Sequence, residues 1–247
     1  MPITNFLYVF LLFFSATQSL YAEKLELSSS MQQTTLLELY TSEGCSSCPS
    51  ADLWLSKLKN DARLWKQIVP IAFHVDYWNY LGWKDRFSNK KHSQRQNNYK
   101  QHGNIESVYT PGLVYNGREW RSWFKHRALP TSMPENAGIL KAVIENNSLS
   151  AEFMPVHPQP SSFMLNIALL AFDQTNNISA GENSGKILNH DFVVIDWQQY
   201  SQTSDKHHHW SLDGLPARFP VNATGIALWV TSANDPTPLQ AIGGYLK

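Results

Sequence analysis

The sequence predicts an α/β domain followed by an antiparallel β-rich domain, on two observations. In the first half, the apolar, β-branched run from Thr34 to Ser42 leads into a turn with Gly and Cys, a segment of helical spacing, and a second apolar run from Ile68 to Trp78. A strand, a helix and a strand in this order form the βαβ unit that builds parallel sheets. Beyond Asn146, short segments of strand composition alternate with turns that contain Gly, Asn and Pro, which is typical of an antiparallel sandwich.

The segment after the turn predicts a helix that begins at Pro49. Proline is tolerated in the first turn of a helix because its missing N–H would have no partner there. The apolar side chains that follow recur at roughly helical spacing, at Leu53, Trp54, Leu58, Leu64 and Trp65. Cys45 is therefore expected at the N-terminus of this helix.

The remaining elements follow from local patterns. The polar stretch 85–101 is expected to form an exposed helix or loop, and Asn116-Gly117 between apolar or aromatic residues predicts a hairpin turn. The spacing in PENAGILKAVIE predicts a helix over 134–145 that closes the first domain. The strands expected in the second domain cover residues 163–172, 192–200, 225–232 and 239–245.

The first 22 residues predict a secretory signal peptide. Their apolar run, from Phe6 to Phe14, is too short to cross about 30 Å of hydrocarbon as a helix, which takes roughly 20 apolar residues. We expect cleavage after Ala22, no permanent membrane anchor, and a mature chain that is periplasmic or secreted. The predicted domains are then residues 23–145 and 146–247.

The charge balance argues against one class of partner. Lys plus Arg and Asp plus Glu number 20 each, so the chain has no net charge at pH 7. A protein that binds nucleic acid or an anionic membrane electrostatically usually carries an excess of basic residues. We therefore expect no nucleic acid partner.

Both cysteines of the chain lie in one Cys-x-x-Cys, Cys45 and Cys48. Structural disulfides in exported proteins usually close longer loops, and a structural zinc site usually needs a second Cys pair or a close His pair. The pair is therefore expected to do redox chemistry, with no metal and no cofactor. A helix N-terminus stabilises thiolate, so Cys45 is the expected nucleophile and Cys48 the resolving thiol. The alternative is an inert disulfide that rigidifies the turn.

Four segments resemble a family of exported bacterial thioredoxin-like proteins whose function is not established: TSEGCSSCPSAD, HVDYWNYLGWKD, VYTPGLVYNG and AGENSGKILNHDFVV. The resemblance implies a thioredoxin-like fold for residues 23–145, with the β-rich domain after it, and a periplasmic location. It also implies that Thr110 and Pro111 form the substrate cleft, with Pro111 in the cis form and the Thr110 backbone paired with an extended substrate. Gly44 replaces the Trp of thioredoxins and Ser46-Ser47 their Gly-Pro, which leaves oxidant, reductant and isomerase open.

Other polar residues have two interpretations each. His74 and Asp76 are at alternate positions of a predicted strand end, so they could share a face and shuttle a proton for Cys48 or bind a metal with the thiols. Alternatively they form a hydrogen-bonded pair beneath aromatic side chains. Residues 181–185, GENSG, form either a contact surface or a plain loop. The three adjacent histidines 207–209 rarely converge on one ion, because neighbours on a strand point to opposite faces.

The leading functional hypothesis is an exported thiol-disulfide oxidoreductase. It would act on protein thiols or disulfides, and a redox partner protein would recycle it. A second hypothesis is a protein that handles a soft ion such as Cu(I) with Cys45, Cys48 and His74, because thiolates select such ions. A third is a binding module without catalysis, since a fold does not by itself imply a function.

Overall fold

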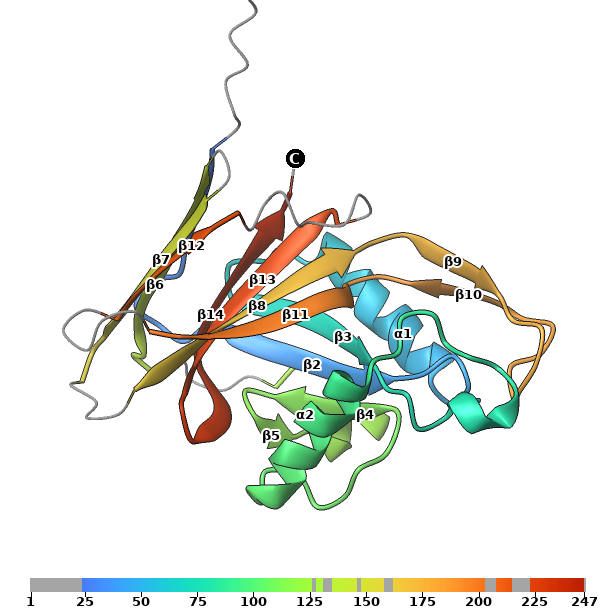
Figure 1. Ribbon diagram of the computed structural model, residues 1–247. Helices are drawn as coiled ribbons and strands as arrows, with labels where there is room; N and C mark the ends of the chain where they lie inside the picture. Colours follow the sequence, from blue (N-terminus) through green and yellow to red (C-terminus); the bar gives the residue numbers. More distant parts are fainter. Residues whose placement is uncertain are drawn as a thin grey trace, which may run out of the picture.

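The computed structural model of the chain describes residues 24–125, 128–130, 135–145, 148–157, 162–202, 208–214 and 223–246. The predicted signal peptide lies outside the described residues. Two β-sheets and one long hairpin make up most of the structure (Figure 1). None of the described helices is long and apolar enough to cross a membrane.

The larger sheet has eight strands drawn from both halves of the chain. In spatial order they are β14 (Asp235–Tyr245), β13 (Gly225–Ser232), β8 (Phe163–Ala171), β11 (Val193–Ser201), β3 (Ile68–His74), β2 (Thr35–Thr41), β4 (Gly112–Tyr115) and β5 (Arg118–Glu119). The pairs β2–β3 and β3–β11 are parallel, and the other pairs are antiparallel. The sheet is therefore mixed.

The predicted fold class, a thioredoxin-like α/β domain with a separate β-rich domain, is wrong. Strands make up 47% of the structure and helices 16%, and the described residues form two α-helices, α1 (Pro49–Ser56) and α2 (Lys90–Gln101). The expected boundary between residues 145 and 146 does not separate two sheets. The fold class differs from the prediction for a hydrogen-bonding reason: the second edge of β3 pairs with the later half of the chain, where Ala72 N–H donates to the Phe192 carbonyl at 2.8 Å.

The smaller sheet is antiparallel and has the order β1 (Leu25–Ser28), β6 (Gly138–Glu145), β7 (Ser148–Pro155) and β12 (His209–Asp213). Its apolar face packs on β8, β13 and β14 of the larger sheet. The helix predicted over 134–145 is therefore wrong, because this segment forms β6. Burial alternates along it, with Leu140 and Ala142 inside and Lys141 outside, which is the period of a strand that covers a core on one face.

The helical connections are short. Beyond α1 and α2, the described part of the chain has 3₁₀ helices at Lys57–Asn60 (η1), Asn79–Leu81 (η2) and Arg121–Phe124 (η3). The predicted helix from Pro49 does not reach Trp65, whose φ of +62° lies in the left-handed region that a right-handed helix excludes. The stretch 85–101 contains α2, which is not simply exposed, because Arg95 and Tyr99 are buried. The predicted hairpin turn at Asn116-Gly117 joins β4 to β5, with φ of +45° and +76°.

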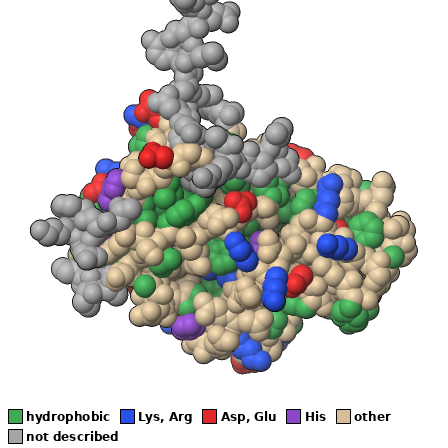
Figure 2. Space-filling view, viewed as in Figure 1, with side chains coloured by type: hydrophobic (Ala, Val, Ile, Leu, Met, Phe, Trp, Pro, Cys, Tyr) green, Lys and Arg blue, Asp and Glu red, His purple; other side chains and the backbone are tan. Residues whose placement is uncertain are grey.

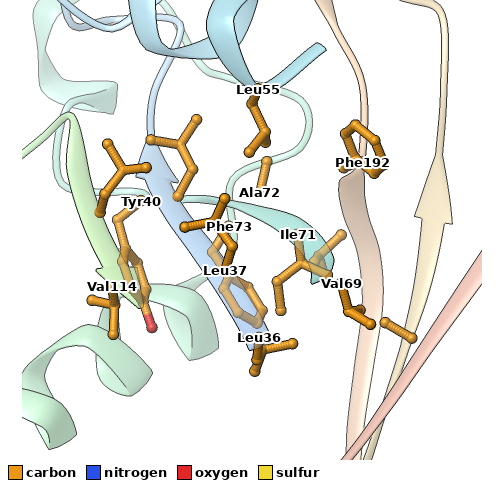
Figure 3. Packing of buried hydrophobic residues seen from close by; sticks show 14 of the residues in the cluster. Leu36, Leu37, Tyr40, Leu55, Val69, Ile71, Ala72, Phe73, Val114 and Phe192 are labelled. Carbon is orange, nitrogen blue, oxygen red and sulfur yellow. The ribbon is translucent and has the colours of Figure 1, made fainter. Parts of the chain in front are cut away.

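Strand β2 is buried along its whole length because helices cover both of its faces. Figure 3 shows its side chains packed with those of β3, with Leu55 of α1 near Ala72. On the face toward α2, the Tyr40 and Phe73 rings stack with centroids 5.7 Å apart, and Glu38 forms a two-point ion pair with Arg95 at 2.7 and 2.9 Å. On the face toward α1, the Thr41 hydroxyl donates to Asp52 at 3.0 Å. The C-terminal end of β2 is thus in contact with α1.

A two-stranded antiparallel hairpin, β9 (Gln174–Asn177) and β10 (Ile187–His190), extends from the sheet alongside α1 (Figure 1). Residues 178–186 join its strands, and we call them the hairpin tip. On the face of the molecule seen in Figure 2, basic, acidic and hydrophobic side chains are scattered over the surface.

Candidate functional site

The two cysteines form a disulfide in the turn between β2 and α1. Their Cα atoms are 5.4 Å apart, and Cys48 is the N-cap of α1, with Pro49 as the first helical residue. The Cys48 N–H donates to the Cys45 carbonyl at 3.2 Å, and the Ala51 N–H to the Cys48 carbonyl at 2.8 Å. The structure therefore places the pair at the start of α1, with Cys45 three residues before the N-cap.

Both sulfur-bearing residues are buried. Cys45 is 1% exposed and Cys48 is 0% exposed, whereas Ser46 and Ser47 between them are exposed. The Ser47 Oγ atom lies 3.3 Å from the Cys45 Sγ atom. A large partner therefore meets the two serines before it meets the sulfur atoms.

The hairpin tip is docked on the cysteine turn. Glu182 accepts a hydrogen bond from the Ser46 N–H at 2.9 Å. The Asn183 side chain is fully buried, and its Nδ2 donates to the carbonyls of Glu43 and Cys45, both at 2.9 Å. The sequence left two interpretations of the motif GENSG open, a contact surface and a plain loop. In the structure this motif makes an internal contact with the disulfide turn.

Thr110 and Pro111 are linked to the same region by one tryptophan. Their peptide bond is cis, as the resemblance implied. The Trp78 indole N–H donates to the Thr110 hydroxyl at 2.7 Å, and the Trp78 Cβ is 3.0 Å from where a Cβ on Gly44 would be. A side chain at position 44 would press tightly against Trp78, so glycine there lets the two loops approach each other.

His74 and Asp76 do not act as a pair. The His74 Nδ1 atom bonds Asp85 Oδ2 at 2.7 Å, and both side chains are fully buried. Asp76 instead accepts a hydrogen bond from the Ser93 hydroxyl of α2. The expectation that these two residues share one face fails because β3 ends at His74, so alternation does not continue to Asp76.

A buried cluster of carboxylates and histidines lies beside the disulfide turn. It contains Glu43, Asp52, His74, Asp85 and His190, all less than 10% exposed, and we call it the His–carboxylate cluster. His190 lies between two acids, with Nε2 3.3 Å from Glu43 and Nδ1 3.8 Å from Asp52. The His74 and His190 rings are in edge contact, with centroids 4.9 Å apart. Two histidines thus meet three carboxylates in one buried site.

Burial and contacts within the cluster shift the pKa values of His190 and Asp85. Burial acts to lower the pKa of His190, but its contacts with Asp52 and Glu43 outweigh burial and raise it to about 10. Burial acts to raise the pKa of Asp85, but its interaction with His74 and two backbone N–H groups lower it overall. Both shifts favour the charged form of the side chain.

Sequence reasoning identified one member of this cluster, His74, as a site residue and missed the other four as such. Glu43 and Asp52 lie in the quoted motif TSEGCSSCPSAD, where Asp52 is followed by the apolar residues of α1, and Asp85 and His190 lie in HVDYWNYLGWKD and AGENSGKILNHDFVV. A charged residue inside a helical apolar run was the available signal, because buried Asp needs a partner.

The run of three histidines forms no joint site in the described part of the chain. His207 lies outside the described residues. His208 Nδ1 approaches Gln202 at 3.2 Å, and His209 Nε2 approaches Ser150 at 3.1 Å. The two described rings therefore bind different neighbours.

Fold and site together define a mixed-sheet protein in which a disulfide-bonded Cys-x-x-Cys turn adjoins a buried His–carboxylate cluster. The chain belongs to the DUF1223 family, proteins of unknown function, whose family model matches residues 36–231. No curated protein matches the chain significantly.

Two solved structures share the fold. One is the crystal structure of a protein from Agrobacterium tumefaciens, 22% identical, with a TM-score of 0.64, covering 88% of this chain and 96% of that one. The other is HBP35 of Porphyromonas gingivalis, 12% identical, with a TM-score of 0.54, covering 88% of this chain and 76% of that one. At these identities the similarity concerns the fold alone.

Proposed function

We propose that the protein is an exported thiol-disulfide exchange protein in which Cys45 attacks and Cys48 resolves. The observation that carries this proposal is the disulfide itself, formed by neighbouring cysteines at the start of α1. Unpaired N–H groups and the helix dipole favour thiolate at such a position. A leaving thiolate near a helix start is also the better leaving group in exchange.

The likeness to thioredoxins that supports the proposal is local. The cysteine turn lies between the parallel strands β2 and β3, and the cis Thr110-Pro111 bond precedes β4, which pairs with β2. Trp78 holds this cis bond close to the turn. We propose that the Thr110 backbone and Pro111 form one wall of the cleft that receives an extended protein substrate.

The hairpin tip determines access in this proposal. With Cys45 1% exposed, a thiolate or disulfide of a partner protein reaches the sulfur only after Glu182 and Asn183 have left the turn. Exchange then runs in two balanced steps. In the first step, a substrate thiolate attacks the Cys45 sulfur and Cys48 leaves as thiolate, which gives a mixed disulfide on Cys45. In the second step, the Cys48 thiolate attacks this mixed disulfide and releases the substrate thiolate, or a second substrate thiol attacks it and leaves both cysteines reduced.

The test is the reduction potential of the pair in the mature protein, measured in glutathione buffers with alkylation of free thiols. We expect a value between about −270 and −120 mV, the range of oxidoreductases. The variant Cys48→Ala should trap a mixed disulfide on Cys45, and the variant lacking both cysteines is the matched control that traps nothing. A pair that stays oxidised below about −300 mV, with no trapped partner, would make the disulfide structural and refute the proposal.

A further inference from the structure

The His–carboxylate cluster has the pattern of a metal site whose ligands are held by a second layer of acids. The Nδ1 atom of His74 is bound to Asp85, so its Nε2 atom is turned the other way. That Nε2 atom is buried and has no hydrogen-bond partner in the described structure. A ligating histidine usually donates its other ring N–H to a carboxylate, which fixes the ring and makes the ligating nitrogen more basic.

His190 faces a different acid. Its Nε2 atom is 3.3 Å from Glu43, and neither of its ring nitrogens makes a regular hydrogen bond. Glu43 is itself fixed, because its carboxylate accepts from the Trp83 indole N–H at 2.7 Å and from the Asn176 amide at 2.5 Å. The Nδ1 atom of His190 is left facing Asp52.

Asp52 supplies the third donor. Its Oδ2 atom accepts from the Thr41 hydroxyl at 3.0 Å and lies 3.8 Å from His190 Nδ1. One donor atom each from Asp52, His74 and His190 lies within 4.8 Å of the others. Three donors about 2.1 Å from one ion lie roughly 3.4 Å apart, so side-chain movements of about 1 Å would close the set.

The charges of the cluster also call for a cation. Glu43, Asp52 and Asp85 are buried, and none of them is paired with Lys or Arg among the described residues. Buried carboxylates are stable only when they are paired or coordinate a metal. The three carboxylates outnumber the two histidines, so a divalent ion would offset negative charge that the histidines do not balance.

A groove beside Asp52 and His190 offers a path by which an ion could reach the cluster. Asp52 and His190 line a groove of about 410 Å³ between α1 and β10, with Leu53 and Ile187 on its walls. An ion could enter there, and a water molecule in the groove could complete its coordination.

From this arrangement the geometry points to a site for a divalent first-row transition ion, such as Zn²⁺ or Fe²⁺, held by Asp52, His74 and His190. Two imidazoles and one carboxylate suit these ions, whereas Cu(I) prefers thiolates. The inference does not depend on the redox proposal, because no cysteine is among the donors.

The experiment is equilibrium dialysis of the full chain against Zn²⁺ in the presence of a competing chelator. We expect one ion per chain. His74→Gln, His190→Gln and Asp52→Asn should each abolish retention, and Asp85→Asn should weaken binding by about tenfold to a hundredfold. His102→Gln, an exposed histidine outside the cluster, is the matched control and should bind as wild type does.

Two further measurements keep the inference falsifiable when a buried variant fails to fold. Cys45→Ser/Cys48→Ser should retain the ion, which separates this site from the redox pair. Co²⁺ bound to the wild type should show the visible bands of nitrogen and oxygen ligation without a thiolate charge-transfer band. Failure of the wild type to retain any of these ions, unchanged binding in folded His74→Gln and His190→Gln, or a thiolate band would each overturn the inference.

Discussion

Removal of the Asn183 side chain should open the disulfide to reductants. In the folded chain its amide makes two hydrogen bonds of 2.9 Å to carbonyls of the cysteine turn, and the side chain is fully buried. A hydrogen bond contributes a net of about 0.5 to 1.5 kcal/mol, so Asn183→Ala should destabilise the docked tip by about 1 to 3 kcal/mol. At about 1.4 kcal/mol per factor of ten, the undocked population rises by about 5- to 150-fold.

The assay is the rate at which a small phosphine or dithiol reduces the Cys45–Cys48 bond, followed by alkylation and mass measurement. At reductant concentrations where the rate is proportional to reductant, it reports the population of the undocked tip, and the variant should react faster by that factor. Ser184→Ala is the control, because Ser184 is exposed on the same tip and bonds Ser179 rather than the cysteine turn. A rate within a factor of two of wild type in Asn183→Ala would show that the tip does not limit access.

Two predictions concern stability. Glu38→Gln should lower the free energy of unfolding by about 3 to 5 kcal/mol in urea titrations, because it leaves the buried Arg95 charge without its acid; a loss under about 1 kcal/mol would contradict this. Gly138→Ala should lower the melting temperature far more than Gly185→Ala. Both glycines have positive φ, but only at position 138 would a Cβ lie 2.2 Å from the Met154 carbonyl oxygen. Equal effects of the two substitutions would refute the steric argument.

Local patterns predicted the strands of the larger sheet but not those of the smaller one, and they predicted the long-range arrangement poorly. The apolar runs that became β2, β3, β8, β11, β13 and β14 were visible because strand composition is a local property. The segment GILKAVIE matched helical spacing as well as strand alternation, and only its pairing with β1 and β7 decides the matter. Likewise nothing in the sequence near Ala72 indicates that β3 will pair with residues more than 100 positions later.

In the candidate site, too, local features could be predicted from the sequence and long-range contacts could not. The Cys-x-x-Cys turn follows from a short motif and the cis bond at Pro111 from the family resemblance, and the structure contains both. The partners of His74 do not follow from local spacing, because Asp85 is 11 residues away and His190 belongs to another half of the chain. A strand end predicted by alternation led to Asp76, whereas the fold turned that carboxylate toward α2.

The docking of the hairpin tip on the cysteine turn has a consequence for biogenesis. Chains are synthesised from the N-terminus at about 5 to 20 residues per second, and about 135 residues separate Cys48 from Asn183. Both thiols therefore emerge roughly 7 to 27 s before the segment that will cover them. During that interval the hairpin tip does not yet cover the pair, so the bond can form before β9 and β10 fold over it.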